Sequence, residues 1–415
     1  MGRLAELYRK HEILFILCST GVLVSAGMGV IAPVLPLFGK TFGVNTALVG
    51  LLMTSFGLAR VLGDLPSGYL TDRFDPRWML IGGPILIGIS SVMAGLATNF
   101  WELTAYRFIQ GAGSAAYNTA AMVAVVDLST PENRGRTLGI YHSSLLSGSS
   151  LGPTIGGVVG EYFGLRAPFF VYAGLSFLIP IWVYLRLNRA VGSLTKERAV
   201  QTSSRPYSLT ASLSAIKSCL ANSNYRLIVL ITFLLFFTRI GSRLTILPLL
   251  GAERLQLGPS QIGLALTWLA VLNFAFLYPA GSMADRWGRK KILVPGCLFM
   301  GLALIMFSFS NEFWFFMISA TLLGIATGVS GPIPAVYAAD VIPSNNYGMT
   351  MGLFRTFGDL GWMMGPVLLG FFSDLGGYGL ALQANAVFLF IGIALFGLRA
   401  KESVSRKHTI EMPEI

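Results

Sequence analysis

The chain has 415 residues, of which 54% are hydrophobic and only 12% are charged. A mean hydropathy of +0.67 excludes a water-soluble domain of this length and indicates a protein surrounded by lipid. The formal net charge of +11 would suit a nucleic-acid-binding protein, but most of the 30 Lys and Arg residues fall in loops on one predicted side of a membrane. This asymmetry follows the positive-inside rule, so we expect both termini in the cytoplasm and no nucleic-acid partner.

Apolar segments of about 20 residues, the length that a helix needs to cross a lipid bilayer, follow one another along the whole chain. Six fall in each half, so the sequence predicts an all-α membrane protein with twelve transmembrane helices in two six-helix bundles. The predicted spans are 13–38, 46–70, 79–98, 101–126, 137–160, 167–187, 226–250, 259–281, 291–310, 313–339, 348–372 and 379–399.

The two halves repeat one another. The segment from Gly68 to Arg73, which contains Asp72, returns 213 residues later as Gly281 to Arg286, which contains Asp285. A repeat of about half the chain indicates two pseudo-symmetric copies of a whole bundle. The same offset relates Gly50 to Gly263, Asp127 to Asp340, Gly139 to Gly352 and Gly152-Pro153 to Gly365-Pro366. The predicted units are an N-terminal bundle (1–188), a basic cytoplasmic linker (189–225), a C-terminal bundle (226–400) and a cytoplasmic tail (401–415).

The sequence contains no pattern typical of an enzyme or of a bound cofactor. Cys18, Cys219 and Cys297 form no C-x-x-C pair, so neither a disulfide framework nor a zinc site is predicted. Gly148-Ser-Ser-Leu-Gly152 matches the nucleophile elbow of hydrolases, but it lies inside a predicted membrane helix rather than between a strand and a helix. A Walker A motif is also missing from the sequence, so we expect neither ATP nor another cofactor.

Three motifs carry a resemblance to a known family. Gly281 to Lys290 is similar to the loop motif G-x-L-a-D-R-x-G-R-K, with Met283 in place of leucine, and the first copy keeps only its beginning. Arg107 to Gly113 is similar to R-x-x-q-G-x-g, and Gly139 to Gly157 matches g-x8-G-x3-G-P-x2-G-G. The chain thus resembles the drug/proton antiporter-like branch of the major facilitator superfamily. The resemblance implies a monomer in the cell (inner) membrane that exchanges protons for a small molecule.

The loop motifs are candidates for a gate on the cytoplasmic side. Each places a carboxylate at the C-terminal end of a helix, where the helix dipole disfavours it unless a cation or another helix end lies nearby. The alternative is a plain solvated turn. The expected gating residues are Asp72, Arg73, Asp127, Asp285, Arg286 and Asp340, with Gly152 and Pro153 as a pliable, closely packed point whose alternative is ordinary helix packing.

Two charged pairs lie within predicted spans, Arg60 with Asp64 and Arg355 with Asp359. Ionisable side chains at this depth usually face the interior of the bundle. The rise of about 1.5 Å per residue, with the helix order that the resemblance implies, sets Asp64 opposite Arg355 and Arg60 opposite Asp359. We expect these pairs to separate when the cytoplasmic side opens. The alternative is that each pair closes within its own helix.

The remaining ionisable residues of the spans predict a cavity between the bundles. His142 is the candidate proton carrier, because the ordinary pKa of histidine lies near neutrality; a packing histidine is the alternative. Arginines exceed aspartates within the spans, so either the glutamates at the rim, Glu102 and Glu161, offset them or the cavity attracts an anion. We favour a cavity for an amphipathic or anionic organic molecule. The expected cavity residues are Arg107, Tyr117, Asn118, His142, Arg239, Arg243, Trp268, Asn273, Phe354 and Trp362.

These features together favour a secondary active transporter, a proton-coupled exporter that works by alternating access. An importer or a lipid flippase for anionic substrates, on the same fold, is the first alternative. A non-transporting membrane receptor or scaffold is the second, and bound ligand without flux would distinguish it from a transporter.

Overall fold

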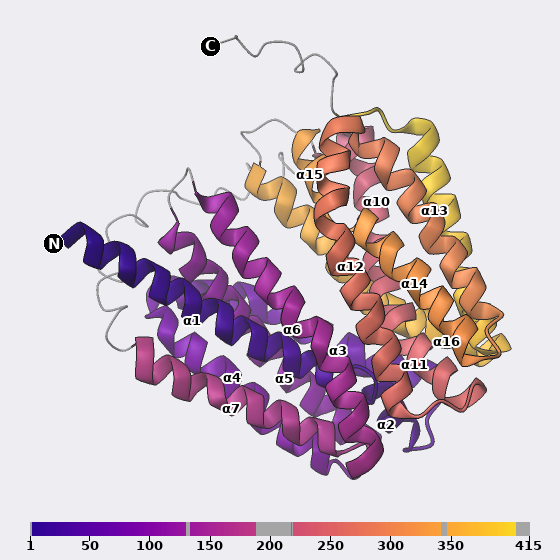
Figure 1. The fold of residues 1–415 in the computed structure, drawn as a ribbon, viewed down its shortest axis with the longest axis horizontal. Coiled ribbons are helices and arrows are strands. Elements are labelled where there is room, and N and C mark those ends of the chain that lie inside the picture. Colours follow the sequence, from indigo (N-terminus) through magenta and orange to yellow (C-terminus); the bar gives the residue numbers. More distant parts are fainter. Residues whose placement is uncertain (1, 130–132, 188–216, 218, 342–346, 404–415) are drawn as a thin grey trace.

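The computed structural model describes residues 2–129, 133–187, 217, 219–341 and 347–403, and every regular element in them is helical (Figure 1). The first bundle contains α1 (Gly2–Ile31), α2 (Leu35–Lys40), α3 (Thr46–Arg73), α4 (Pro76–Leu96), α5 (Phe100–Leu128), α6 (Arg134–Phe163) and α7 (Ala167–Leu187). The second contains α10 (Ser223–Phe237), η2 (Thr238–Ile246), α11 (Leu247–Leu249), η3 (Leu250–Arg254), α12 (Pro259–Trp287), α13 (Arg289–Ser308), α14 (Phe313–Ser330), α15 (Ile333–Asp340) and α16 (Tyr347–Arg399).

The number of membrane crossings agrees with twelve. Nine helical segments among the described residues are long and apolar enough to span a bilayer. One of them holds two helices, because α16 breaks at Gly376 and Gly377, where Gly377 has a φ of +79°. The remaining two crossings are α5 and α6, which are 29 and 30 residues long but more polar. The predicted fold class is therefore confirmed.

The elements differ from the prediction in three places. Helix α1 begins at Gly2, well before the predicted start at residue 13. The seventh crossing changes at Thr238 from α-helical to π-helical geometry, which apolar periodicity did not predict. Most of the predicted linker 189–225 lies outside the described residues, and α10 begins at Ser223.

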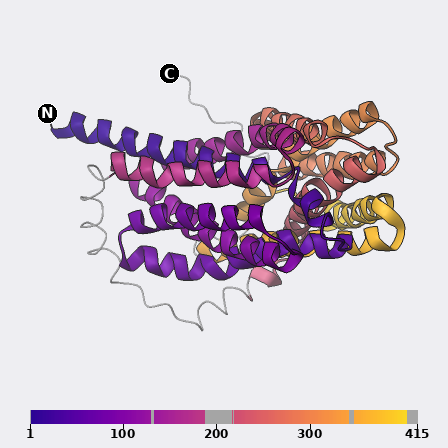
Figure 2. The ribbon, with the colours of Figure 1, turned by 90° about the horizontal axis from the view of Figure 1, so that it is seen from below.

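The two bundles lie side by side, indigo to magenta and orange to yellow in Figure 1, and Figure 2 presents the same arrangement from below. We call the side where α1 begins and α16 ends the terminal side, and the side of α2 and η3 the far side. The bundles meet at the far side and diverge toward the terminal side.

Glycines related by the repeat record this divergence. A Cβ atom on Gly50 or Gly263, nearer the far side, would lie 2.5 or 2.3 Å from backbone atoms of the other bundle. On Gly68 or Gly281, nearer the terminal side, it would meet nothing within 4 Å. Close backbone approach between the bundles therefore requires glycine at positions 50 and 263. In this conformer it does not require glycine at positions 68 and 281.

The repeat is also visible contact by contact. Gly50 packs on the backbone of Pro366, and Gly263 packs on the backbone of Pro153, so the same contact closes both seams between the bundles. We call the contact of α3 with α16 the charged seam and the contact of α6 with α12 the uncharged seam. The offset of 213 residues that relates Gly50 to Gly263 also relates Pro153 to Pro366.

Candidate functional site

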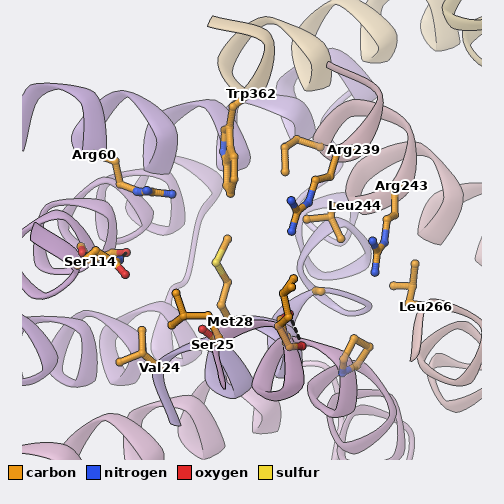
Figure 3. Close-up of a pocket in the computed structure, with 18 of the residues that line it drawn as sticks. Val24, Ser25, Met28, Arg60, Ser114, Arg239, Arg243, Leu244, Leu266 and Trp362 are labelled. Atoms are coloured by element: carbon orange, nitrogen blue, oxygen red, sulfur yellow. Dashed lines mark hydrogen bonds between the residues drawn. The ribbon is translucent and has the colours of Figure 1, made fainter. Parts of the chain in front are cut away.

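A cavity of about 370 Å³ lies between the bundles (Figure 3). This volume falls within the range of small-molecule sites. Helices α1, α3, α5, α6 and α7 line it from the first bundle, and η2, α12 and α16 line it from the second. Its polar or aromatic lining residues are Ser25, Arg60, Ser114, Asn118, His142, Ser149, Tyr172, Arg239, Arg243 and Trp362.

The charge of the cavity lining is one-sided. Three arginines, Arg60, Arg239 and Arg243, line it, and its described lining includes no Asp or Glu. The Nε atoms of Arg60 and Arg243 are buried without a hydrogen-bond partner. Buried guanidinium donors without partners are costly, so the cavity favours a ligand that supplies acceptor oxygens.

The π-helical element η2 positions two of these arginines. Its turns are wider than those of an α-helix, and Thr245 donates a hydrogen bond of 3.0 Å to the carbonyl of Ile240, five residues earlier. In Figure 3 the guanidinium groups of Arg239 and Arg243 point into the cavity from one side. Arg60 reaches in from the other, beside Trp362. Short π-helical segments occur frequently at functional sites.

Half of the predicted cavity residues line this cavity: Asn118, His142, Arg239, Arg243 and Trp362. Arg60, predicted as part of a gate, lines it as well. Sequence reasoning missed the contribution of α1, which supplies Ser25, Met28 and Gly29. These residues stand at positions i, i+3 and i+4, so they share one face of a mostly apolar helix, and this spacing could have indicated a cavity-facing side of α1.

Arg107 and Tyr117 do not line the cavity, and their prediction is corrected. Both are buried inside the first bundle, where the Arg107 Nε donates a hydrogen bond of 3.3 Å to the Leu52 carbonyl and its guanidinium lies over the ring of Phe56. The Tyr117 hydroxyl is 2.8 Å from the hydroxyl of Thr20. These side chains join helices of one bundle, so a packing role replaces the predicted substrate contact.

The second bundle accounts for three further corrections. Trp268 is 42% exposed, and its Nε1 donates a hydrogen bond to the Thr321 hydroxyl, so it binds α12 to α14. The backbone of Asn273 packs closely against Gly328 of α14. Phe354 packs against the apolar cluster on the terminal side of this bundle. None of the three belongs to the cavity lining.

The charged seam contains the first of the two predicted pairs. A guanidinium nitrogen of Arg355 lies 3.2 Å from Asp64 of the other bundle, and its Nε lies 3.9 Å from Asp359 of its own helix. The expected contact between Asp64 and Arg355 is confirmed. It is formed in this conformer, in which the bundles diverge toward the terminal side (Figure 1). The expected separation of the pair on opening of the cytoplasmic side stays a prediction.

The second predicted pair is not formed. Arg60 makes no ion pair within 4.0 Å of Asp359 among the described residues. Its guanidinium lies over the ring of Trp362, 5.4 Å from the ring centre. Both residues line the cavity, so the side chain turns toward open space and an aromatic face rather than toward the carboxylate.

The predicted gating residues of the second loop motif meet at a residue that was not singled out. Arg289, at the start of α13, contacts Asp285, and its Nε is 3.4 Å from Asp340. Arg286 is exposed and makes none of the ion pairs among the described residues. The cation near Asp285 is instead Arg289, at the start of the neighbouring helix. Arg289 follows Asp285 across the break at Gly288 that separates α12 from α13, so the contact joins the end of one helix to the start of the next.

The first loop motif differs from the second. The side chain of Asp72 lies outside the described residues. Arg73 lies over the ring of Tyr69, with its guanidinium 4.5 Å from the ring centre. Asp127 is exposed at the end of α5 and has an interaction partner.

Gly152 and Pro153 serve different contacts. A Cβ atom on Gly152 would lie 2.5 Å from the carbonyl oxygen of Ala26, so this glycine allows α6 to approach α1 within the first bundle. Pro153 lines the cavity, and its carbonyl faces Gly263 across the uncharged seam. The close packing that was predicted here is present.

The family model described as Major Facilitator Superfamily matches residues 17–258 and 228–413 of this chain. The quinolone resistance protein NorA of Staphylococcus aureus is 24% identical over 392 residues, which cover 94% of this chain and 95% of that protein. Multidrug resistance protein 2 of Bacillus subtilis is 24% identical over 393 residues, 93% of each chain. An uncharacterized MFS-type transporter of Methanocaldococcus jannaschii is 24% identical over 386 residues, 93% of this chain and 97% of that one.

Solved structures share the fold. A bacterial homologue of the human lysosomal transporter Spinster, in an inward-facing and unoccupied conformation, aligns with a TM-score of 0.74 and 18% identity over 94% of this chain and 96% of that one. A peptide transporter in complex with alafosfalin aligns with a TM-score of 0.73 and 15% identity over 94% and 95% of the two chains. With the family match across both bundles, the chain belongs to the Major Facilitator Superfamily of membrane transporters.

Proposed function

We propose that this transporter is a secondary active exporter that exchanges protons for small amphipathic or anionic organic molecules by alternating access. The observation that carries the proposal is a cavity lined from both bundles, with the bundles in contact at the far side and apart at the terminal side. Rocking about such a cavity is how matched bundles pass a solute. The export direction is supported by the drug-resistance names of two relatives.

We assign the terminal side to the cytoplasm of a cell (inner) membrane. The support is the clustering of Lys and Arg in the loops of that side. In this assignment the conformer described above opens to the cytoplasm. A substrate would enter the cavity from the terminal side and leave from the far side.

We propose His142 as the proton carrier. It lines the cavity and is exposed within it, so a proton can reach it while the terminal side is open. Asp64 and Asp359 are the alternatives, because both interact with Arg355 at the charged seam. Protonation of either carboxylate would weaken that contact and link proton binding to movement of the bundles.

A flux measurement tests the proposal. The purified protein in proteoliposomes is screened with organic anions and cationic dyes, with and without an imposed pH gradient. We expect transport of at least one organic solute that accelerates when protons move in the opposite direction. Bound solute without flux would instead indicate a receptor. Flux of anions without any effect of the pH gradient would favour the runner-up, an importer or flippase for anionic substrates, which the three cavity arginines favour.

A further inference from the structure

The cavity identifies the chemical class of its ligand more narrowly than the proposed function does. Its formal charges are the three guanidinium groups of Arg60, Arg239 and Arg243, and its described lining contains no carboxylate that would attract a cationic drug. Arg239 and Arg243 lie one turn apart, reach in from the same side, and make no ion pair with any described residue.

We propose that the cavity binds an organic anion whose carboxylate, or a similar oxyanion, is held by Arg239 and Arg243. This inference rests on the proposed function, since it names the substrate of the same cavity. Guanidinium groups bind carboxylates through paired, charge-assisted hydrogen bonds. The apolar part of the anion lies against Met28, Leu244 and the indole of Trp362, which surround the centre of the cavity. A cation of equal size would leave the arginines unpaired beside a like charge.

The test compares three compounds of one shape: 2-naphthoate, its neutral amide and 2-naphthylmethylammonium. Their affinities for the full chain in lipid nanodiscs are measured by calorimetry. We expect the anion to bind at least about tenfold more tightly than the other two, the ratio typical of one charge-assisted hydrogen bond. Arg239→Gln and Arg243→Gln should each remove about this factor for the anion alone. Arg186→Gln, at an exposed arginine at the end of α7, is the matched control.

Two outcomes overturn the anion proposal: equal affinity for the three compounds, or anion affinity that Arg239→Gln and Arg243→Gln leave unchanged. Arg239→Lys, which keeps the charge, guards against a folding defect, and it should retain the preference for the anion. Binding is measured without flux. Anion binding with no transport would therefore refute the proposed function alone, and transport of a cation without anion binding would refute the ligand class alone.

A second inference comes from the far side, where each bundle holds a helix of the other. Glu161, at the end of α6, accepts hydrogen bonds from the hydroxyl and the backbone N–H of Ser260 at the start of α12, the latter at 2.9 Å. Asp374, in α16, accepts hydrogen bonds of 2.8 and 2.9 Å from the N–H groups of Thr46 and Ala47 at the start of α3.

These two contacts are copies of one another. Asp374 stands 213 residues after Glu161, the offset of the repeat. A third contact lies on the axis that relates the bundles, because Lys40 and Glu253 are related by the same offset and approach each other to 3.9 Å. A carboxylate at a helix N-terminus is stabilised by the unpaired N–H groups and by the helix dipole. The contacts of Glu161 and of Asp374 both cross from one bundle to the other.

We infer that Glu161 and Asp374 form a duplicated latch that holds the far side closed. Its two carboxylates stabilise helix ends of the opposite bundle, and both contacts are lost when the far side opens. The predicted gate was placed on the other side of the membrane, in the loop motifs, so this latch is a separate device.

The latch is tested by a distance between spin labels at Leu96→Cys and Phe309→Cys, after replacement of the three native cysteines. Both positions are exposed, lie on the far side, and are related by the repeat offset. Glu161→Gln and Asp374→Asn should each raise the ratio of far-side-open to far-side-closed molecules about fivefold, the effect of losing one helix cap. The double variant should add the two effects.

Glu102→Gln is the matched control. Glu102 lies on the same side and accepts hydrogen bonds from the N–H and hydroxyl of Thr98, four residues earlier in its own bundle. Its loss should leave the label distance unchanged. The latch is refuted if the double variant leaves the ratio unchanged, or if Glu102→Gln changes the ratio as much as Glu161→Gln does.

Discussion

The charged seam and the uncharged seam share a backbone contact and a carboxylate contact at the far side, and they differ at the positions of Asp64 and Arg355. Both close through a glycine of one bundle packed on the proline backbone of the other, Gly50 on Pro366 and Gly263 on Pro153. The charged seam adds the ion pair of Asp64 with Arg355. At the uncharged seam the corresponding positions are Leu277 and His142. Besides the contact of Glu161 with Ser260 at its far-side end, a hydrogen bond of 3.0 Å from the Thr154 N–H to the Thr267 hydroxyl joins the bundles there.

The comparison indicates that the glycine contact is needed at both seams, whereas an ion pair is needed at one seam alone. Closure at the far side needs matched surfaces on both seams, because the bundles move as bodies and neither seam can close alone. A backbone contact at glycine supplies that match in any pair of equivalent helices. In the proposed mechanism, a charged pair at one seam is sufficient to act on the equilibrium of both bundles, so no second copy of the pair is required.

The largest effect on transport is expected from variants that disrupt the glycine contact common to both seams. Gly50→Ala and Gly263→Ala each place a Cβ atom within 2.5 Å of backbone atoms that no rotamer change can move. We expect transport in proteoliposomes to fall at least about tenfold for either variant, since overpacking of this kind costs about 1–3 kcal/mol in the far-side-closed conformer.

Gly82→Ala and Gly174→Ala are the controls for these variants, because both lie inside helices, away from the seams and the loop motifs, with nothing within 4 Å of the added atom. They should transport at a normal rate. Equal loss in all four variants would mean that helix flexibility, rather than the seam contact, accounts for the effect.

The ion pair of Asp64 with Arg355 is present at the charged seam and has no counterpart at the repeat-related positions of the uncharged seam. Asp64→Asn leaves Arg355 without its partner in the other bundle. Because the side chains are 26% and 55% exposed, the loss is about 1 kcal/mol rather than the 3–5 kcal/mol of a fully buried pair. We expect transport to fall about fivefold. The exchange of Asp64→Arg with Arg355→Asp should restore part of it, and no restoration would contradict a direct pairing.

His142 tests whether the uncharged seam carries the proton. His142→Gln keeps a polar side chain at the cavity but removes the titration near neutrality. We expect the dependence of transport rate on pH between about 6 and 8 to flatten. An unchanged pH profile would indicate that Asp64 or Asp359, rather than His142, carries the proton.

The smallest effect is expected at the terminal side. Arg289→Gln removes the residue that joins Asp285 to Asp340, whereas Arg286→Gln changes an exposed neighbour that makes none of the described ion pairs. The side chain of Arg289 is 12% exposed, but its partners Asp285 and Asp340 are 65% and 31% exposed. Ion pairs with exposed partners contribute at most about 1 kcal/mol, so transport should fall about twofold for Arg289→Gln and remain unchanged for Arg286→Gln. A larger loss of transport for Arg286→Gln than for Arg289→Gln would support the predicted gating role of Arg286.

The sequence was sufficient for features that depend on distance along a helix. The repeat predicted two bundles, and the rise per residue, with the helix order that the resemblance implies, predicted that Asp64 meets Arg355. It was insufficient for features that depend on the direction in which a side chain points. Arg107 lies on α5, which also lines the cavity, but it faces Phe56 and Leu52. The far-side latch was missed for another reason, because Glu161 and Asp374 bind backbone N–H groups that leave no trace in side-chain patterns.

The central claim is that the bundles alternate about the cavity, with the far side opening as the terminal side closes. Two label pairs related by the repeat test it in one preparation: Leu96 with Phe309 on the far side, and Gly68 with Gly281 nearer the terminal side. On addition of a transported anion and a pH gradient, we predict that a population appears with a longer far-side distance and a shorter terminal-side distance. Transport with both distances fixed, or with both lengthened together, would contradict the account.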